Sequence, residues 1–540
     1  MPVATPPRSS RTPSRRASLS TPTLRRSTLV DVVDEAASRT PELLVHLDRP
    51  LYAFPEIGTS LSYAQVAHSG KRLAAALHHA GVRSGSRVAI LKSNHLDTYL
   101  LTYAAMRIGA VPALISPELS PGTAESLLEA LRPDALVTDA AVVKEKALRG
   151  SSPGDYAELL ISVGDGVAGA APLDLDAPEA RMEVIRDLDA PVLITHTSGT
   201  TGTPKFAVQS NRTLAANWAA IPAWAKMLRL RETVGAHLAF PHIRVVTGFT
   251  SLMAMRWSLV VVTDPTPSHV DAVFSEYRPG VIETFPNVFI LWESLLESPT
   301  RPLSTARLFF NTFDAMHPRT MRALLDGSSR KNPLYIQQYG QTETGPITTR
   351  FYTRKLVRHA DGRCVGHAVP GFSRFRILAD GRGGRREGAG EIVVRSKSLV
   401  IDYLGRSQQY AENFRDGWWR MTDLGWRSRW GCLHLHDREI DATDRAESLL
   451  ALEDLLMQRL PGMLEGVFIP RADGTITPVV CMREDQPLDL RSWSEATRDF
   501  PLLSQPHQCS WGTVPRTATW KVQRVRARQL LERGELPSLD

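Results

Sequence analysis

One loop constrains this chain more than any other segment. Residues 195–210 read THTSGTTGTPKFAVQS, so an apolar strand runs directly into a stretch of glycine and hydroxyl side chains. Gly199 and Gly202 allow the backbone to approach a ligand closely, and successive N–H groups in such a turn form an anion-binding concavity. Lys205 adds a positive charge, and Ser210 is expected to cap a helix that begins there. The loop predicts a polyphosphate site, with a plain surface loop as the alternative. A Walker A loop has four residues between its glycines, whereas this loop has two, so the Walker A class is excluded.

Helical and buried-strand patterns alternate around this loop. Apolar residues recur at helical spacing in residues 63–80, whereas short apolar runs at 87–91, 191–195 and 258–263 are typical of buried strands. Alternation of this kind predicts α/β layers with a largely parallel sheet. The stretch DGRGGRREGAG at 380–390 interrupts a hairpin-like region, so part of the chain is expected to form antiparallel strands.

Composition narrows the class of protein. The chain has 540 residues, of which 43% are hydrophobic, enough for several domains with cores of their own. No apolar run approaches the ~18–20 residues that span a bilayer, so no membrane is expected as a partner. Most of the net charge of +7 lies in residues 1–27, which hold six arginines and no acid, so a nucleic-acid partner is not expected either. This tail is expected to be disordered, and four widely spaced cysteines favour a reduced, cytoplasmic setting.

The loop and four later segments together resemble the adenylate-forming superfamily of acyl- and aryl-CoA ligases, peptide-synthetase adenylation domains and luciferases. The family loop reads S/T-S-G-S/T-T-G-x-P-K-G, and this chain departs from it only at Phe206. The family motifs YGxTE, GWYRTGD, DR or GR, and PRTxxGKxxR then follow in order. They correspond here to QYGQTE at 338–343, GWWRMTD at 417–423, DR at 437–438 and PRTATWKVQR at 515–524. Each match alone is weak, but five in the family's order leave little room for chance.

The resemblance implies a role for each matched residue. The residues expected to bind ATP are Thr197, Ser198, Gly199, Thr200, Thr201, Gly202, Lys205, Tyr339, Gly340, Thr342, Asp423 and Arg438. The expected catalytic residues are Lys521, Thr342 and Glu343, with Glu343 holding Mg²⁺, which prefers oxygen ligands. A carboxylate would attack the α-phosphorus of ATP while pyrophosphate leaves. Because a carboxylic acid is already ionised at pH 7, positioning and charge stabilisation supply the catalysis.

Departures from the family segments mark the substrate pocket. The family PxFHxxG reads PHIRVVTG here, with Arg244 where a histidine or aromatic residue is usual, and the family GGA reads Phe313-Asp314-Ala315. One expectation is that Arg244 and Asp314 pair with each other or face solvent. The other is that they line the pocket, with Phe313 and Gly345, and recognise a charged substrate such as an amino or hydroxy aromatic acid.

Three further departures concern glycines. Thr422 and Trp520 stand where the family motifs have glycine, beside Asp423 and Lys521. The stretch after Arg438 lacks the glycine of the family loop that forms the pantetheine tunnel. The resemblance therefore supports adenylation more firmly than transfer to CoA.

Three functions are consistent with these residues. The preferred one is ATP-dependent adenylation of a small carboxylic acid, followed by transfer to the thiol of CoA or of carrier-protein phosphopantetheine. An aromatic acid of specialised metabolism is the favoured substrate. The second passes the intermediate to nitrogen, in an amide ligase or in an ATP-dependent diazotase that activates nitrite for transfer to an aryl amine, with Arg244 as anchor for the aryl carboxylate. The third, a catalytically dead nucleotide-binding relative, is disfavoured because six functional residues are retained, namely Lys205, Thr342, Glu343, Asp423, Arg438 and Lys521.

The resemblance also implies the architecture. After the tail at 1–27, residues 28–436 are expected to form a large multi-layer α/β domain with mixed sheets, and residues 437–540 a small mobile α+β lid. The active site would lie between them. Rotation of the lid about residues 437–441 would change which side chains face the nucleotide.

Overall fold

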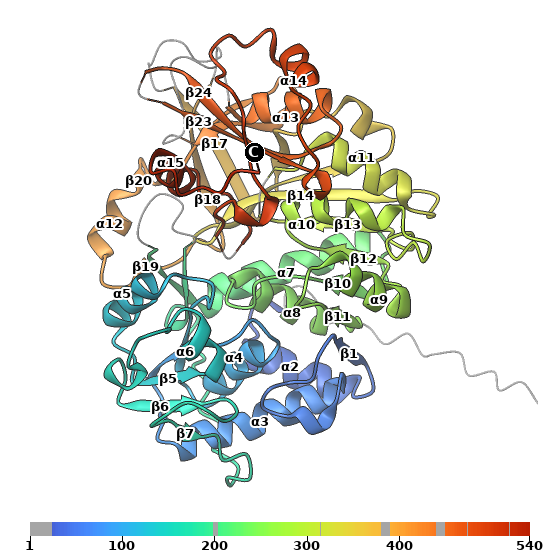
Figure 1. The fold of residues 1–540 in the computed structure, drawn as a ribbon. Coiled ribbons are helices and arrows are strands. Elements are labelled where there is room, and N and C mark those ends of the chain that lie inside the picture. Colours follow the sequence, from blue (N-terminus) through green and yellow to red (C-terminus); the bar gives the residue numbers. More distant parts are fainter. Residues whose placement is uncertain are drawn as a thin grey trace, which may run out of the picture.

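The computed structural model describes residues 24–197, 204–313, 315–379, 389–438, 449–471, 473–517 and 519–539 (Figure 1). Two large sheets with helices packed on them form the body, and a third, small sheet lies in the C-terminal part of the chain. The predicted α/β class with mixed sheets is confirmed. In the part of the chain that the structure describes, no helix combines the length and apolar character needed to cross a bilayer.

The first sheet carries the loop of interest. Its strand order is β19-β9-β8-β4-β3-β5-β6-β7. Strands β3 to β8 run parallel, whereas β9 turns back antiparallel to β8. The strands are β3 (Arg87–Ile90), β4 (Val111–Leu114), β5 (Ala135–Thr138), β6 (Leu159–Ser162), β7 (Ala171–Pro172), β8 (Pro191–His196), β9 (Phe206–Ser210) and β19 (Asp402–Tyr403). The helices of this half are α2 (Leu29–Arg39), α3 (Tyr63–His79), α4 (Asp97–Arg107), α5 (Pro121–Leu131) and α6 (Ala140–Glu145).

The second sheet is parallel in one half and antiparallel in the other. Its order is β17-β18-β21-β22-β16-β15-β14-β13-β12-β10-β11-β1-β2, with β20 paired to β21. The run from β14 to β1 is parallel. The strands are β1 (Leu44–Leu47), β2 (Ser60–Ser62), β10 (Val234–Ala236), β11 (Leu259–Val261), β12 (Val281–Glu283), β13 (Leu308–Asn311), β14 (Leu334–Gln341), β15 (Gly345–Tyr352), β16 (Cys364–Ala368), β17 (Ser373–Ala379), β18 (Gly390–Ser396), β20 (Phe414–Arg415), β21 (Trp418–Arg427) and β22 (Leu433–Arg438). The accompanying helices are α7 (Asn211–Met227), α8 (Ile243–Met255), α9 (Pro267–Tyr277), α10 (Pro286–Leu291), α11 (Pro318–Gly327) and α12 (Ser407–Glu412).

The C-terminal unit consists of the third sheet and its helices. Its elements are α13 (Leu449–Arg459), β23 (Met463–Pro470), β24 (Ile476–Met482), α14 (Leu490–Thr497), β25 (His507–Gln508) and α15 (Arg524–Glu532). Figure 1 shows this unit, in orange and red, at the opposite end of the molecule from α2 and α3. One apolar cluster joins it to the body, since Phe285 and Phe289 share that cluster with Leu456 and Phe468. Because residues 439–448 lie outside the described residues, the domain boundary near 437 stays a prediction.

Local sequence explains the helix expected at 63–80. The Ser62 hydroxyl accepts the N–H of Gln65, and the Gln65 side chain accepts the N–H of Ser62, which makes a capping box at the start of α3. Gly70 permits close packing on α4, because a Cβ there would lie 2.3 Å from the Tyr103 ring. The predicted helix is confirmed and ends at His79.

The helix expected to follow the loop begins where it was predicted. Helix α7 starts at Asn211, and the Ser210 hydroxyl directly before it accepts the N–H of Thr213 at 3.4 Å, so Ser210 caps the helix as expected. The sequence did not predict the strand between the loop and the helix, because the five buried residues 206–210 form β9. A run this short cannot be assigned to a strand or a helix by periodicity alone.

Ordered structure begins within the expected tail, before residue 28. Residues 1–23 of the expected tail lie outside the described residues. Leu24 is fully buried, and its carbonyl accepts a hydrogen bond from Trp218 Nε1 at 3.1 Å. The last residues assigned to the tail are therefore part of the body.

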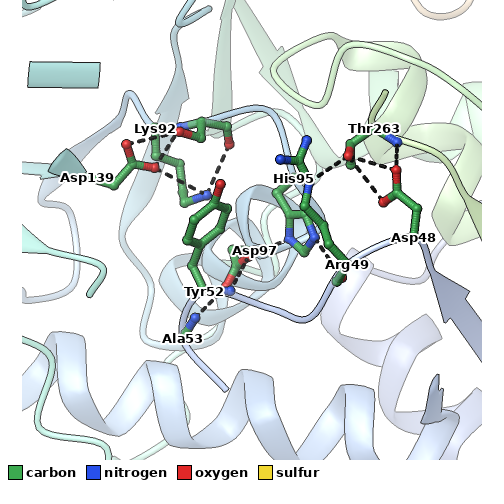
Figure 2. Close-up of polar contacts among 10 residues, drawn as sticks. Asp48, Arg49, Tyr52, Ala53, Lys92, His95, Asp97, Asp139 and Thr263 are labelled. Carbon is green, nitrogen blue, oxygen red and sulfur yellow. Dashed lines mark hydrogen bonds and ion pairs between the residues drawn. The ribbon is translucent and has the colours of Figure 1, made fainter. Parts of the chain in front are cut away.

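A buried lysine marks the carboxyl edge of the first sheet (Figure 2). Lys92 follows β3, and Asp139 follows β5. The Lys92 ammonium lies 3.7 Å from Asp139 and 4.7 Å from the centre of the Tyr52 ring. It also donates to the carbonyl of Ser93 at 3.0 Å. Protein groups thus compensate its charge.

A chain of polar contacts continues from there to the second sheet (Figure 2). Asp97 accepts the N–H of Ala53 at 2.9 Å and bonds to His95 Nδ1 at 2.6 Å. His95 Nε2 in turn contacts the carbonyl of Arg49 at 3.2 Å. The Arg49 side chain donates to the hydroxyl of Thr263, which follows β11, at 2.6 Å. The network ties together the strand ends at which the two sheets meet.

Candidate active site

The two strands that flank the glycine loop close its base. His196, at the end of β8, pairs with Phe206, at the start of β9. The Thr197 N–H donates to the carbonyl of Lys205 at 2.9 Å, and the Lys205 N–H donates to the Thr197 hydroxyl at 3.1 Å. Residues 198–203 lie outside the described residues; they contain Ser198, Gly199, Thr200, Thr201 and Gly202 of the expected ATP site. What the structure fixes is a tight hairpin base that holds Lys205 in place.

A tyrosine connects Lys205 to the expected metal-binding carboxylate. The Tyr403 hydroxyl donates to Glu343 Oε1 at 2.6 Å, and the Lys205 ammonium lies 5.2 Å from the centre of the Tyr403 ring. Burial raises the pKa of Glu343, although Tyr403 and Lys205 oppose the rise. Tyr403 therefore contacts both Lys205, through its ring, and Glu343, through its hydroxyl.

The expected nucleotide-binding residues meet across two strand pairs. The Tyr339 hydroxyl, on β14, donates to Asp423 Oδ2, on β21, and Gln341 Nε2 approaches the same oxygen at 3.5 Å. Asp423 lies opposite Arg438 in the β21–β22 ladder. The carbonyl of Thr342 accepts from Gln209 at 3.5 Å. The structure thus brings Tyr339, Asp423 and the backbone of Arg438 to one place.

Two glycines in this region are required by close contacts. A Cβ on Gly340 would lie 2.0 Å from the carbonyl oxygen of Gly345. Gly345 itself has φ +61°, and a Cβ there would meet the side chains of Ser398 and Asn217 within 2.5 Å. Both positions therefore exclude larger residues, and Gly345 contributes backbone to the site.

Lys521 lies on a tight loop of the C-terminal unit. The Thr517 N–H donates to the carbonyl of Lys521 at 2.8 Å, and the Lys521 N–H donates to the Thr517 hydroxyl at 3.2 Å. Trp520, within this loop, has φ +61° and stacks on Trp511 with ring centres 5.3 Å apart. Asn287 of the body donates to the carbonyl of Trp520 at 2.8 Å, which fastens the Lys521 loop to the body.

Two buried histidines border the space that Lys521 approaches. His242 caps α8, since its Nδ1 accepts the N–H of Arg244 at 3.1 Å, so the ring proton belongs on Nε2. Burial and the nearby charges of Lys521 and Arg244 lower the pKa of His242 to about 3. His196 Nε2 accepts the N–H of Ser116 at 3.1 Å, and burial lowers its pKa as well. Both rings are therefore neutral at pH 7.

Phe313 is placed beside one of these histidines. Its ring centre lies 4.9 Å from that of His242 and 4.5 Å from that of Phe285. Phe313 is buried, with 6% of its surface exposed. The three rings form one aromatic wall at the ends of β10, β12 and β13.

Arg244 has a partner that the sequence did not predict. Its Nε and Nη2 donate to the two carboxylate oxygens of Glu283 at 2.6 and 2.7 Å. Only 14% of the Arg244 side chain and 8% of the Glu283 side chain are exposed, which excludes the solvent-facing alternative. Asp314, the other expected partner, lies outside the described residues.

A cavity of about 670 Å³ lies between the body and the C-terminal unit. Ser116, His196, Pro204 and His242 line it from the body, and Thr517 and its neighbours line it from the Lys521 loop. Its size suits a small-molecule ligand. It extends from the flank of the glycine loop to the flank of the Lys521 loop.

Three residues of this site escaped the sequence analysis. Tyr403 and Glu283 belong to no motif, and their importance depends on neighbours far away in the chain. His242 was passed over in favour of Arg244, although a polar residue directly before an apolar helical pattern is a start signal that could have identified it.

Comparison with known proteins gives a consistent family. Residues 33–404 match the model of the family described as AMP-binding enzyme. The chain is 39% identical over 534 residues to 3-amino-2-hydroxy-4-methoxybenzoate diazotase of Streptomyces cremeus, covering 93% of this chain and 95% of that protein. It is 27% identical over 508 residues to indoleacetate–CoA ligase of Aromatoleum aromaticum, covering 89% and 94%. The solved structure of an anthranilate CoA ligase with anthranoyl-AMP has the same fold, with a TM-score of 0.79 at 18% identity, covering 96% of this chain and 99% of that one.

Proposed function

This chain belongs to the AMP-binding enzyme family of adenylate-forming enzymes, and on that premise we propose that it is a diazotase. In this proposal it activates nitrite with ATP and transfers the nitroso group to the amino group of an aromatic acid. The observation that carries the proposal is the 39% identity to a diazotase that extends over nearly the whole of both chains. The name of that relative describes a benzoate with adjacent amino and hydroxyl substituents, and we propose an amino-hydroxybenzoate as the substrate class here.

The first half-reaction joins two anions. A nitrite oxygen attacks the α-phosphorus of ATP, the bond to the β-phosphate oxygen breaks, and pyrophosphate leaves. Nitrite, like a carboxylate, is already ionised at pH 7, so the residues must position and stabilise charge rather than remove a proton. Lys205 would attend the departing phosphates. Lys521 would stabilise the charge shared between the nitrite oxygen and the α-phosphate.

The second half-reaction forms the nitrogen–nitrogen bond. The amine lone pair attacks the nitroso nitrogen, the N–O bond to the phosphate breaks, and AMP leaves with that electron pair. The amine loses one proton to give an N-nitrosamine. This product then takes up a proton and loses water to become the diazonium ion. Neutral His242 would donate its Nε2–H to the phosphate oxyanion of the departing AMP without adding a charge.

Glu343 fits a role in holding Mg²⁺. It is a carboxylate whose Oε1 accepts a hydrogen bond from Tyr403, and Lys205 is the positive charge that opposes the rise of its pKa. Mg²⁺ is commonly held by one or two carboxylates together with substrate phosphates and water. When bound, the ion would neutralise phosphate charge in the transition state.

Transfer to a thiol remains the competing function. It was the preferred expectation from the sequence, and the likeness to indoleacetate–CoA ligase supports it. In that case the substrate carboxylate, not nitrite, would attack ATP. The two functions differ in which oxyanion triggers pyrophosphate release.

The test supplies each oxyanion separately at pH 7.5. The purified chain with ATP and Mg²⁺ is given ¹⁵N-nitrite, 3-amino-2-hydroxybenzoate, both together, or the acid with CoA, and pyrophosphate is measured. We expect release that depends on nitrite, and a product that couples to 2-naphthol as an azo dye carrying one ¹⁵N atom. Release with the acid alone, raised by CoA and indifferent to nitrite, would establish the thiol ligase instead.

A further inference from the structure

The Arg244–Glu283 pair is held in one geometry from several sides. The two hydrogen bonds at 2.6 and 2.7 Å make a bidentate contact. The guanidinium lies 5.2 Å from the centre of the Phe310 ring. On another side is Gly248, where a Cβ would lie 3.1 Å from Nη1 of Arg244. The backbone of α8 thus leaves room for the guanidinium at a position that any side chain would crowd.

The pair lies at the ligand-binding edge of the parallel sheet. Glu283 is the last residue of β12, and its carbonyl accepts the N–H of His237, which follows β10, at 3.1 Å. Arg244 lies in the first turn of α8, two residues after His242 of the aromatic wall. In open α/β sheets, ligands bind outside the carboxyl ends of the strands. Both charges therefore lie at the sheet edge where a ligand is expected, near His242, which lines the cavity.

Stability alone does not account for this pair. Removing two charges from water is costly, and apolar residues of similar volume are often equally or more stabilising at such positions. The pair also has unused capacity. A carboxylate has about four lone-pair sites and a guanidinium five N–H groups, and the bidentate contact uses two of each. Within the pair, Nε and Nη2 of Arg244 make both contacts, so Nη1 is not used by Glu283.

We propose that the Arg244–Glu283 pair recognises adjacent amino and oxygen substituents on the substrate ring. Glu283 accepts an N–H of the aryl amine, and Arg244 donates from Nη1 to the hydroxyl or carboxylate oxygen on the neighbouring ring carbon. Glu283 thereby aims the amine lone pair, so it acts as a positioning residue. The role assigned to the amine rests on the proposed function. The preference for ortho-related substituents follows from the side-by-side donor and acceptor.

Binding tests the pair without any turnover. Calorimetry on the full chain compares 3-amino-2-hydroxybenzoate with 4-aminobenzoate, whose amine has no ortho oxygen. We expect the ortho compound to bind at least about 10-fold more tightly, on the scale of one charge-assisted hydrogen bond. Glu283→Gln and Arg244→Gln should each abolish that preference. The matched control is Asp34→Asn, which alters another carboxylate paired with an arginine, Arg107, and should keep it.

Turnover then separates this inference from the proposed function. On each variant, the rate of diazonium formation is divided by the rate of nitrite-dependent pyrophosphate exchange, and we expect that ratio to fall about 10-fold or more in Glu283→Gln. A wild-type chain that shows the ortho preference but makes no diazonium would defeat the proposed function and leave the pair standing.

Misfolding has its own control. A single variant can unfold because it leaves one charge buried alone. In that case the double variant Arg244→Met with Glu283→Gln, which removes both charges, is measured in place of the single variant. A preference that persists in the folded variants, or its absence from the wild type, would overturn the inference.

Discussion

At the scale of single residues, two of the residues with a left-handed backbone stand where the family motifs have glycine. Thr422 has φ +56° and Trp520 has φ +61°. They lie next to Asp423 and Lys521, which are the expected ribose-binding and catalytic residues. The left-handed turn is therefore kept although its usual residue is gone, so the surrounding fold maintains this backbone against the preference of the side chain.

Thr422→Gly should stabilise the protein. A β-branched residue in the left-handed region costs on the order of 1–3 kcal/mol, and glycine removes that cost while adding some freedom to the unfolded chain. We expect a net gain of about 1 kcal/mol, measured as a higher urea midpoint. Thr422→Ala should give much less, because alanine meets the same backbone restriction. Equal effects of the two substitutions would argue against strain.

Lys521→Ala should lower the adenylation step by at least ~10²-fold, on the scale of losing one oxyanion donor. Nitrite-dependent exchange of pyrophosphate into ATP measures that step directly. Lys331→Ala, which removes an exposed lysine, provides the matched control. An unchanged exchange rate in the Lys521 variant would remove this residue from the catalytic set.

Sequence motifs identified the residues expected to do the chemistry, but not the side chains that contact them. Lys205, Glu343 and Asp423 could be chosen from the sequence because each stands in a string of fixed spacing. Glu283 could not, because its pairing with Arg244 arises only when β12 and α8 come together in the fold. The choice of Arg244 as a pocket residue was thus possible from the sequence, whereas its neutralisation by a buried carboxylate was not.

At the scale of elements, local signals were sufficient where an element is long. The helical spacing of apolar residues predicted α3 to within one residue of its end, and the structure adds a capping box at its start. The five-residue strand β9 was missed, since its neighbours in the sheet decide its conformation. The order of the strands in the second sheet depends on contacts distant in the chain, and no local pattern contains it.

The network of Figure 2 makes a prediction at this scale. Burial alone would raise the pKa of Asp97, but Lys92, His95 and backbone N–H groups outweigh it and lower the pKa to about 2. A lowered pKa stabilises the fold above the unfolded value of 3.8, and the contribution is lost as the pH falls toward 2. Asp97→Asn should therefore destabilise the chain at pH 7 by on the order of 2 kcal/mol or more.

The pH dependence of that difference is the sharper measurement. Urea unfolding is measured at pH 7, 5, 4 and 3. The difference in the free energy of unfolding between wild type and Asp97→Asn should become smaller below pH 4. Asp189→Asn, which breaks an exposed ion pair with Arg212, should change stability little at any of these values. If that free-energy difference is constant down to pH 3, the charge of Asp97 contributes nothing to stability.

At the scale of the whole molecule, the position of the C-terminal unit decides where Lys521 lies. Asn287 holds the Lys521 loop, and Glu293 of the body pairs with Arg483 of the unit. Together with the shared apolar cluster, these contacts dock the unit in the arrangement that completes the cavity. The proposed first half-reaction is therefore expected to depend on docking through this interface.

One contact of this interface contains a histidine and therefore depends on pH. His317, at the start of α11 in the body, bonds through Nδ1 to Asp454 of α13 in the unit. Burial would lower the pKa of His317, but Asp454 and Glu453 outweigh burial and raise it. A raised pKa means that docking is favoured below the ordinary value of 6.5, and that this contribution is lost as the pH rises through the higher, docked value.

Docking should therefore weaken with rising pH. Hydrogen exchange of the α13 amides, corrected for its intrinsic pH dependence, should show protection that falls between pH 6 and pH 9 in the wild type. His317→Gln cannot gain the proton, so its protection should be lower at pH 6 and independent of pH. Because the proposed role of Lys521 requires the docked unit, the pyrophosphate exchange rate should follow the same curve in the wild type. Parallel pH curves for the two proteins would assign the dependence to another group.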